Sequence, residues 1–208
     1  MSQHGYGHNV LRELLFFAVR LLVGAYPAGS VPHDDVQTLY FPNHTSHLDA
    51  LTLLAALRLR SRASTRPVAA RDYWCGSKPR RWIAEHVLDV VFIDRARQAD
   101  EDPLAPVRQA LADGDSLIFF PEGTRHEGGL PGDFKSGLYH LARDFSRVQF
   151  TPVYLENLHR ILPKASLLPV PLINKVHFGA PVSWVPGESK ADFLTRARKA
   201  VCALSPGH

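Results

Sequence analysis

Cysteine is scarce in this chain of 208 residues, which contains only Cys75 and Cys202. Two cysteines cannot supply the disulfide framework that stabilises small secreted domains. The N-terminal residues also lack the basic stretch, clean apolar run and small-residue cleavage site that mark a secretory signal. We therefore expect a reducing, cytoplasmic environment. Nothing around Cys75 indicates a Cys-His pair, so a reactive cysteine nucleophile is disfavoured.

One strongly apolar stretch is interrupted by charge. Residues 10–26 read VLRELLFFAVRLLVGAY and include Arg12, Glu13 and Arg20. A membrane-spanning helix needs about 20 predominantly apolar residues, and Arg20 lies well inside this run. The segment fits better as a helix in the membrane interface, with its charged side chains toward water. Packing against the protein's own core is the alternative, and the sequence leaves both open.

Acidic residues are nearly absent from the most basic region. The chain has a formal net charge of +4 and a pI near 9.2, and Asp72 is the single acid within residues 58–81. This region fits a solvated basic face, or a surface that meets anionic lipid headgroups, a phosphorylated cofactor or an acidic carrier protein. It lacks the aromatic interleaving and the recognised motifs of nucleic-acid-binding segments, so we expect no nucleic acid partner. Its basic residues are Arg58, Arg60, Arg62, Arg66, Arg71, Lys78, Arg80 and Arg81.

Strand-like and helix-like segments alternate along the rest of the chain, whose 45% apolar and 21% charged content is typical of a globular protein. Expected strands are residues 38–41, 68–70, 90–93, 117–120, 148–155 and 172–178. Expected helices are residues 47–59, 80–86, 103–111, 134–145 and 189–204. The alternation favours an α/β fold with a central, mostly parallel, mixed sheet flanked by helices and preceded by an N-terminal apolar helix. Residues 159–171 are expected to form a surface loop.

A cluster of polar residues follows the first expected strand. Residues 43–49 read NHTSHLD. On one continuous helix His44 and Asp49 would point about 140° apart, so they pair only if His44 lies in the loop and Asp49 in the first helical turn. A neutral imidazole can remove the proton of an attacking hydroxyl, and a carboxylate on its other nitrogen fixes the tautomer. The alternative is a capping box, in which Ser46 and Asp49 only fix the helix start. His47 either shapes the pocket or is a polar residue of the helix start.

Two more polar clusters follow expected strands. FPEGTR occupies residues 120–125, and FIDR occupies residues 92–95. In the first, the glycine permits close approach of a ligand, and the threonine hydroxyl and planar guanidinium suit a phosphate. Its glutamate can orient the arginine or accept a hydrogen bond from a substrate hydroxyl. The alternative for both clusters is a polar turn with a surface ion pair of small energetic worth.

The order and spacing of these segments resemble the motifs of the glycerolipid acyltransferase family, which includes the 1-acylglycerol-3-phosphate acyltransferases. NHTSHLD, VFIDR and FPEGTR match its motifs, and TPVY at residues 151–154 resembles its late Val-Pro-Val segment. The resemblance covers residues 39–154. NHxxxxD alone is a weak pattern, but NHxxxxD followed much later by FPEGTR is highly specific.

The resemblance implies transfer of a fatty acyl group from acyl-CoA or acyl-carrier protein to a hydroxyl of a lysophospholipid or glycerol-phosphate acceptor. The expected reaction converts 1-acylglycerol-3-phosphate to phosphatidic acid, at the cytoplasmic face of a membrane, by a peripheral or monotopic protein. We expect His44 to be the base and Asp49 its partner, with no metal and no cofactor besides the thioester co-substrate. Residues 1–32 are then an N-terminal apolar helix and candidate interface anchor, and residues 33–208 the acyltransferase domain. The positions implied in acceptor binding are Arg95, Glu122, Gly123, Thr124, Arg125 and Lys135.

Two positions depart from the family pattern, which usually has glycine where this chain has Asp89 and valine where it has Thr151. A side chain at Asp89 is expected to alter the acceptor pocket, so a different lipid hydroxyl stays open as the acceptor. Two rival classes also stay open. One is a metal-dependent esterase with His44, His47 and Asp49 as ligands, and the other is a non-catalytic lipid-binding protein of the same fold.

Overall fold

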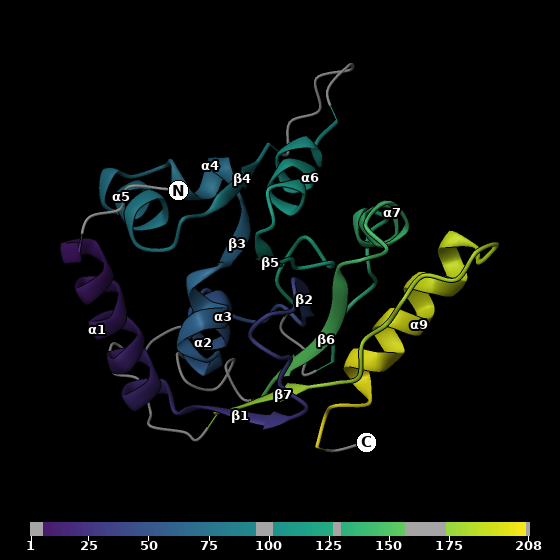
Figure 1. The fold of residues 1–208 in the computed structure, drawn as a ribbon, viewed down its shortest axis with the longest axis horizontal. Coiled ribbons are helices and arrows are strands. Elements are labelled where there is room, and N and C mark those ends of the chain that lie inside the picture. Colours follow the sequence, from purple (N-terminus) through teal and green to yellow (C-terminus); the bar gives the residue numbers. More distant parts are fainter. Residues whose placement is uncertain (1–5, 95–101, 127–129, 157–173, 207–208) are drawn as a thin grey trace.

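Seven strands form one sheet in the order β1-β7-β6-β2-β5-β3-β4 in the computed structural model (Figure 1), which describes residues 6–94, 102–126, 130–156 and 174–206. The strands are β1 (Ala25–Gly29), β2 (Thr38–Pro42), β3 (Thr65–Ala70), β4 (Val91–Ile93), β5 (Ser116–Ile118), β6 (Gln149–Leu155) and β7 (Asn174–Phe178). The helices of the described residues are α1 (Tyr6–Val23), α2 (Asp49–Ala56), α3 (Leu59–Ala63), α4 (Arg71–Trp74), α5 (Lys78–His86), α6 (Ala105–Ala112), α7 (Gly137–Asp144) and α9 (Lys190–Cys202).

Most neighbouring strands run parallel. β2 pairs in parallel with β5 and β6, and β3 pairs in parallel with β4 and β5. β6 and β7 are antiparallel, and β1 is parallel to β7, so β1 and β7 run opposite to the other strands. The predicted α/β fold with a mostly parallel mixed sheet is therefore confirmed.

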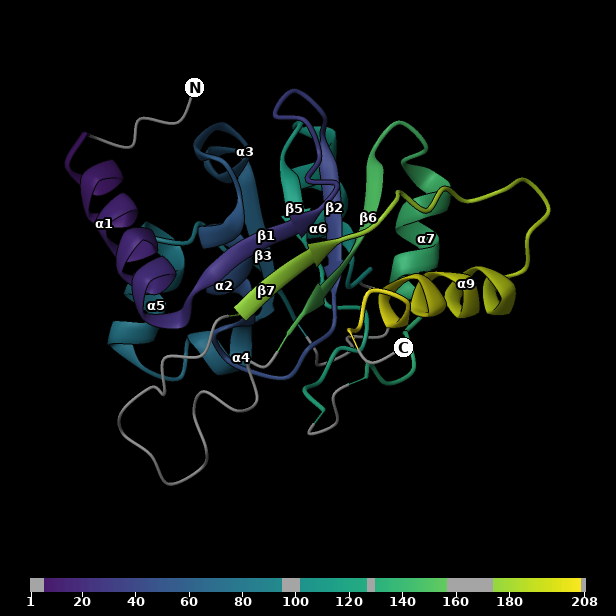
Figure 2. The ribbon, with the colours of Figure 1, turned by 90° about the horizontal axis from the view of Figure 1, so that it is seen from below.

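Helices cover both faces of the sheet, because successive residues of a strand point to opposite faces. Leu39 and Phe41 of β2 join the core beneath α6, α7 and α9, whereas Tyr40 joins the core beneath α1, α2 and α5. Figures 1 and 2 place these two groups of helices on opposite sides of the sheet. All residues of β2 are buried, and this double cover explains the largely apolar sequence of the strand.

Some elements differ from those that the sequence predicts. The helix expected over residues 47–59 is two helices, because Leu57 and Arg58 adopt extended backbone angles between α2 and α3. β1 has no counterpart among the predicted strands, since AYPAG contains proline and glycine and becomes a strand by pairing with β7. α4 is likewise an addition. The loop expected over residues 159–171 lies outside the described residues.

α1 packs on the core with one side and is fixed there by charged side chains. Phe16 and Val19 are buried, and the Arg62 guanidinium lies 5.0 Å from the centroid of the Phe16 ring. Arg62 also forms an ion pair with Glu13 at 2.8 Å, and Arg12 donates a hydrogen bond to the Arg62 carbonyl oxygen at 3.1 Å. The core-packing alternative for this segment is therefore observed. In the part of the chain that the structure describes, no helix combines the length and apolar content that crossing a bilayer requires.

The basic region of residues 58–81 does not form one continuous surface. Arg62 is buried against α1. Arg66 forms ion pairs with Asp89 at 3.1 Å and with Asp115 at 2.7 Å. The charges that remain at the surface come from the rest of the region, which includes the exposed Arg58, Arg60, Lys78, Arg80 and Arg81.

Candidate active site

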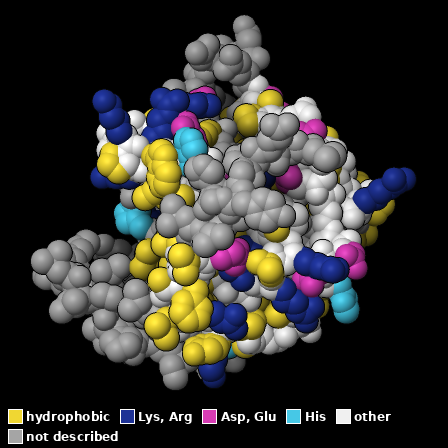
Figure 3. Space-filling model, turned by 60° about the vertical axis from the view of Figure 1, so that its left-hand side comes forward, with side chains coloured by type: hydrophobic (Ala, Val, Ile, Leu, Met, Phe, Trp, Pro, Cys, Tyr) yellow, Lys and Arg dark blue, Asp and Glu magenta, His cyan; other side chains and the backbone are white. Residues whose placement is uncertain are grey.

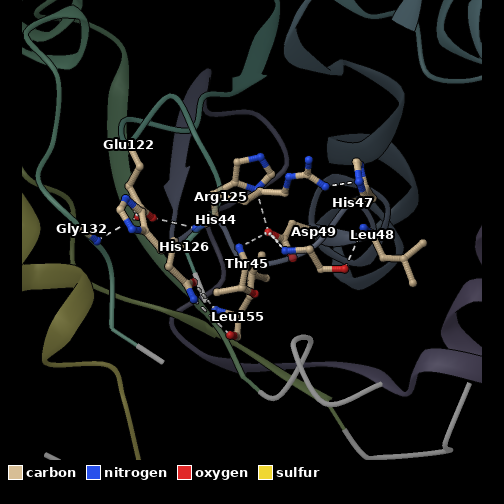
Figure 4. Close-up of polar contacts among 12 residues, drawn as sticks. His44, Thr45, His47, Leu48, Asp49, Glu122, Arg125, His126, Gly132 and Leu155 are labelled. Atoms are coloured by element: carbon tan, nitrogen blue, oxygen red, sulfur yellow. Dashed lines mark hydrogen bonds and ion pairs between the residues drawn. The ribbon is translucent and has the colours of Figure 1, made fainter. Parts of the chain in front are cut away.

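The predicted site residues that the structure describes gather where β2 and β5 end. These strands are parallel neighbours, so their carboxyl ends lie at one edge of the sheet, which we call the carboxyl edge. His44 follows β2, and Glu122 of the FPEGTR segment follows β5. The two residues are 78 positions apart in sequence, and the fold brings them into contact (Figure 4).

His44 and Asp49 form a direct pair. Nδ1 of His44 lies 2.8 Å from Oδ2 of Asp49. The Asp49 side chain is fully buried, whereas 22% of the His44 side chain is exposed. His44 lies in the loop after β2, and α2 begins at Asp49. This confirms the geometry that the five-residue spacing requires.

Backbone N–H groups hold the Asp49 carboxylate in place. Its Oδ2 atom also accepts hydrogen bonds from the N–H groups of Thr45 at 2.7 Å and Ser46 at 2.9 Å. The Ser46 hydroxyl accepts from the Leu48 N–H at 3.2 Å. The N-cap residue of α2 is Leu48, without a side-chain cap, so the capping-box alternative is not what the structure shows. The Asp49 carboxylate instead holds the loop before α2 and the His44 ring through one oxygen. Because Nδ1 of His44 is bonded to Asp49, Nε2 is the ring nitrogen that can accept a proton.

The neighbouring strand ends restrain the same loop. The Phe120 ring stacks on the His44 imidazole, with ring centroids 4.1 Å apart and an interplanar angle of 28°. The buried Asn43 side chain donates to the Leu155 carbonyl oxygen at 3.3 Å and accepts from the Leu155 N–H at 2.7 Å. Asn43 therefore joins the exit of β2 to the end of β6. A histidine held in this way is arranged for general-base chemistry at one fixed position.

Glu122 lies inside the site, where only 2% of the residue is exposed. Its Oε1 atom accepts a hydrogen bond from the His44 N–H at 2.8 Å, and Oε2 accepts from the Gly132 N–H at 2.8 Å. Nε2 of His126 lies 3.5 Å from Oε2, and the His126 N–H donates to the His44 carbonyl oxygen at 2.9 Å. No motif in the sequence indicates Gly132 or His126, because both lie in irregular chain after FPEGTR.

Arg125 extends to His47, and its Nη1 atom contacts Nε2 of the imidazole (Figure 4). A guanidinium only donates hydrogen bonds, so this nitrogen of His47 is the acceptor and carries no proton. Burial lowers the pKa of His47 below its ordinary value, and the positive charge of Arg125 lowers it further. His44 and Arg80 act in the same direction, and Asp49 opposes them. His47 is therefore a neutral partner of Arg125, which favours the pocket-shaping interpretation of this residue.

Three of the remaining predicted residues lie around the FPEGTR turn. Gly123 has φ 67°, in the left-handed region that favours glycine, and a Cβ atom there would lie 2.8 Å from Nζ of Lys135. The Lys135 side chain therefore crosses directly over this turn, and the backbone N–H of Lys135 donates to the Pro121 carbonyl oxygen at 2.8 Å. Thr124 is exposed in the same turn. Arg95 lies outside the described residues.

Asp89 lies at the opposite end of the sheet. It precedes β4, and it pairs with Arg66 near the start of β3, which in turn pairs with Asp115 just before β5. β3, β4 and β5 are parallel, so this cluster marks the amino edge of the sheet. The Asp89 side chain therefore lies away from the His44–Asp49 pair at the carboxyl edge, and its expected effect on the acceptor pocket stays a prediction.

Comparison with known proteins decides the family. Residues 29–156, or 128 of the 208 residues, match the Acyltransferase family. The chain belongs to the acyltransferase family. This membership confirms the resemblance to the glycerolipid acyltransferases, and the matched range contains the His44–Asp49 pair and the FPEGTR segment.

Several relatives within the acyltransferase family have names. The chain is 35% identical over 118 residues to 1-acyl-sn-glycerol-3-phosphate acyltransferase alpha of Homo sapiens, a match that covers 55% of this chain and 39% of that protein. It is 28% identical over 141 residues to 1-acyl-sn-glycerol-3-phosphate acyltransferase LPAT1, chloroplastic, of Arabidopsis thaliana, covering 66% of this chain and 36% of that protein. The chain spans less than half the length of these two relatives.

A solved structure has the same fold. It is the crystal structure of the 1-acyl-sn-glycerophosphate (LPA) acyltransferase PlsC from Thermotoga maritima, with a TM-score of 0.71 and 20% sequence identity. The match covers 96% of this chain and 78% of that chain. The likeness therefore extends over nearly all of the acyltransferase chain described above.

Proposed function

We propose that this protein is an O-acyltransferase that transfers a fatty acyl group from an acyl thioester to the free hydroxyl of 1-acylglycerol-3-phosphate, giving phosphatidic acid. The observation that carries the proposal is the pairing of His44 with the buried Asp49 at 2.8 Å, beside the FPEGTR turn. The names of the human and Arabidopsis relatives support the acceptor. The donor is acyl-CoA or acyl-carrier protein, and the assay below separates the two.

The reaction follows from the position of His44. Its Nε2 atom takes the proton of the acceptor hydroxyl while the hydroxyl oxygen attacks the thioester carbonyl carbon. Asp49 holds the protonated ring through Nδ1 and offsets its charge. When the tetrahedral intermediate collapses, the carbon–sulfur bond breaks, and the thiolate takes the proton back from Nε2. The acceptor supplies the nucleophile, so no serine or cysteine of the chain is needed.

The acceptor's phosphate is expected to bind the cationic side chains beside this pair. Arg125 lies on His47, within the segment that carries His44 and Asp49, and a planar guanidinium matches phosphate oxygens in a bidentate manner. Lys135 lies over Gly123 in the same turn and adds a second positive charge. Arg95 is assigned to the same phosphate from the family resemblance.

We further propose that the outer face of α1 lies on the cytoplasmic surface of a membrane. Leu14, Phe17 and Leu21 are 60%, 67% and 72% exposed, and their spacing places them along one stripe of the helix. Trp82 of α5 is exposed as well. Figure 3 shows hydrophobic side chains beside Lys and Arg on the side of the molecule where α1 and α5 lie. Apolar residues beside basic ones are the pattern of a helix that rests in an anionic interface.

A panel assay tests the reaction. Purified protein is given acyl-CoA or acyl-carrier protein, each with 1-acylglycerol-3-phosphate, other lysophospholipids or glycerol-3-phosphate, and the product is identified by mass. We expect phosphatidic acid with at least one donor, and at least about 100-fold slower formation by His44→Ala prepared in the same way. Another lipid product would move the proposal to a different acceptor. Loss of thioester with no acylated acceptor would identify an esterase, and no consumption of thioester would favour a lipid-binding protein.

The metal-dependent esterase is the second candidate, and the geometry gives its ligands other tasks. Oδ2 of Asp49 already accepts from three N–H donors, and Nε2 of His47 accepts from Arg125. Across the described ranges, no group of three or more His, Cys, Asp or Glu residues is placed to hold a metal ion. Acyl transfer should therefore survive titration with a chelator, whereas an esterase of this kind would lose its activity.

A vesicle-binding assay tests the membrane proposal. Wild-type protein should sediment with vesicles of phosphatidylcholine and phosphatidylglycerol, and less with phosphatidylcholine alone. The double variant Phe17→Glu and Leu21→Glu should stay in the supernatant. Val185→Glu is the matched control, because Val185 is an exposed hydrophobic residue elsewhere on the surface, at 54%, and it should sediment like the wild type. Equal sedimentation of the double variant would rule out α1 as the contact.

A further inference from the structure

Among the residues that the structure describes, Glu122 is the acidic side chain of the FPEGTR segment that contacts the loop after β2. The FPEGTR segment brings it to the loop after β2, and the residue is 2% exposed. Burial of a carboxylate is costly unless hydrogen bonds and charges compensate for it. Its contacts therefore indicate what the buried group does.

Both carboxylate oxygens of Glu122 are used by backbone N–H groups. Oε1 accepts from His44 and Oε2 accepts from Gly132, each at 2.8 Å. The second oxygen also lies 3.5 Å from Nε2 of His126. These short contacts to an ionised acceptor are stronger than hydrogen bonds between neutral groups. The Glu122 side chain is fully buried, so a substrate hydroxyl has no access to its remaining lone pairs in this arrangement.

The contacts fix the His44 backbone from two sides. Glu122 holds the N–H of His44, and the N–H of His126 donates to the carbonyl oxygen of the same residue at 2.9 Å. The ring of His44 is held separately by Asp49 and by stacking on Phe120. The backbone contacts therefore fix the position of the His44 main chain, and the ring contacts fix the orientation of its imidazole.

The charge of Glu122 also argues against direct contact with the acceptor. The acceptor of the proposed reaction carries an anionic phosphate, and a carboxylate beside it would repel it unless cations intervene. Arg125 in the FPEGTR turn and Lys135, whose side chain lies over Gly123, are the groups of opposite charge. This separates the segment into cations that attract the acceptor and an anion that faces the protein.

We propose that Glu122 is a positioning residue, which holds the His44 backbone so that Nε2 meets the acceptor hydroxyl, and is not itself an acceptor ligand. The proposal rests on the acyl transfer proposed above. It changes the role that the family resemblance implies for Glu122, and it makes the loop that contains Gly132 part of the catalytic support.

The test is the kinetics of Glu122→Gln with 1-acylglycerol-3-phosphate. The site needs two acceptor atoms, but a glutamine amide has one oxygen acceptor and one NH₂ donor. In the variant, the NH₂ group would therefore face the backbone N–H of His44 or of Gly132. Misplacing a catalytic group by about 1 Å lowers the rate about 100-fold, and we expect kcat to fall by about 10-fold to 100-fold. The acceptor KM should stay within about twofold, because the phosphate contacts are unchanged. Thioester hydrolysis without acceptor, where measurable, should fall by the same factor as transfer.

Glu122→Asp is the second variant, in case the glutamine does not fold. It keeps an acceptor-only carboxylate but is one methylene shorter, so it reaches one of the two N–H groups and should lose less kcat than glutamine. Glu188→Gln is the matched control. Glu188 accepts from Arg196 and from the Val185 N–H, far from the FPEGTR turn in sequence, so its loss should lower the melting temperature without changing kcat.

The outcomes separate the roles. An acceptor KM raised tenfold or more with kcat unchanged would make Glu122 an acceptor ligand and overturn the proposal. Unchanged kcat per folded molecule in the glutamine or aspartate variant, with a lowered melting temperature, would make the residue merely structural and overturn it as well. Failure of the wild type to acylate any acceptor would instead defeat the proposed function, since the variants are compared only with an active wild type.

Discussion

The two edges of the same sheet carry acidic clusters that are built differently. At the carboxyl edge, Asp49 and Glu122 are buried. Oδ2 of Asp49 and both carboxylate oxygens of Glu122 accept from backbone N–H groups. At the amino edge, Asp89 and Asp115 are partly exposed and pair with the long side chain of Arg66. Both clusters consist of carboxylates with hydrogen-bond donors, but backbone N–H groups can move less than a long arginine side chain.

This difference separates a reactive site from a structural one. Backbone donors move only when the loop moves, so they fix the direction of a carboxylate to which a histidine is bonded. A long arginine side chain can pair again in another geometry, and surface ion pairs contribute only about 0–1 kcal/mol to folding. We therefore expect substitutions at the carboxyl edge to change catalysis, and substitutions at the amino edge to change stability slightly.

His44→Ala should have the largest effect. Removing a general base lowers the rate by about 10²-fold to 10⁴-fold, and the loss should appear in kcat for phosphatidic acid formation. The fold should persist, because the imidazole is partly exposed and its backbone contacts remain. Circular dichroism and a melting curve serve as the folding control. A well-folded His44→Ala protein with wild-type kcat would show that His44 is not the catalytic base and would contradict a catalytic role for the carboxyl edge.

Asp49→Asn should come next, with a fall in kcat of about 10²-fold, inside the range for general-base catalysis. An asparagine in the same place cannot accept reliably from the His44 ring and from Thr45 and Ser46. Leaving buried donors unpaired costs about 1–3 kcal/mol, so urea unfolding should show a loss of that size. If the variant kept its stability and lost only activity, the role of Asp49 in holding the loop before α2 would be wrong.

His47 should make acceptor binding sensitive to acid. Its pKa is lowered by burial, by Arg125 and by the further positive groups His44 and Arg80, with Asp49 opposing, so it is neutral at pH 7. As the pH falls through this lowered pKa, His47 gains a proton and repels Arg125. A contact worth about 1 kcal/mol changes the acceptor KM about fivefold.

His47→Gln isolates that effect, because the glutamine oxygen can accept from Arg125 but does not titrate. Between pH 7.5 and about 5.5, below the ordinary histidine pKa near 6.5, the acceptor KM should rise more in the wild type than in the variant, since the acceptor phosphate titrates at about pH 6 with both proteins. The comparison uses KM alone, because kcat reports the chemical step in both proteins. The same lowered pKa means that the stability from neutral His47 is present above the unfolded pKa and lost as the pH falls through the folded one. Parallel KM curves would contradict the prediction.

Asp89→Gly should have the smallest effect. Asp89 has φ 51°, where glycine is favoured, so the variant removes backbone strain while it loses the pair with Arg66. These changes oppose each other, and the free energy of unfolding should change by no more than about 1 kcal/mol. Asp89→Ala keeps the strained angle and loses the pair, so it should be less stable than Asp89→Gly. Any change in kcat or acceptor KM for either variant would connect the two edges.

Sequence patterns predict the structural features that depend on residues close together in the chain. The burial of β2, the start of α2 close to Asp49 and the cap of α9 by Ser189 follow from apolar runs, spacing and capping chemistry. The pairing of His44 with Asp49 belongs to this class, because the loop and first helical turn after β2 supply both residues. The same patterns do not predict β1, whose strand character comes from β7.

Contacts across the chain lie beyond such patterns. Glu122 and His44 are 78 residues apart, as are Arg125 and His47. Neither segment indicates by itself which of its side chains is buried against the other segment. The family pattern placed Glu122 with the acceptor, because it records which residues are present and not which atoms they face. Arg66 likewise belongs to a basic region in the sequence, but its acidic partners come from the segments before β4 and β5.

The pairing of β1 with β7 has a consequence for the order of folding. The two strands lie far apart in sequence, and β7 itself pairs with β6. Contacts between distant segments form slowly, because a long loop must close first. During synthesis, β1 therefore cannot pair with β7 until most of the chain has left the ribosome. Until then, the strand that follows α1 is not yet part of the sheet. We expect the exposed apolar stripe of α1 to be available to a bilayer or a chaperone throughout synthesis, so that the helix can settle before the sheet fixes its position.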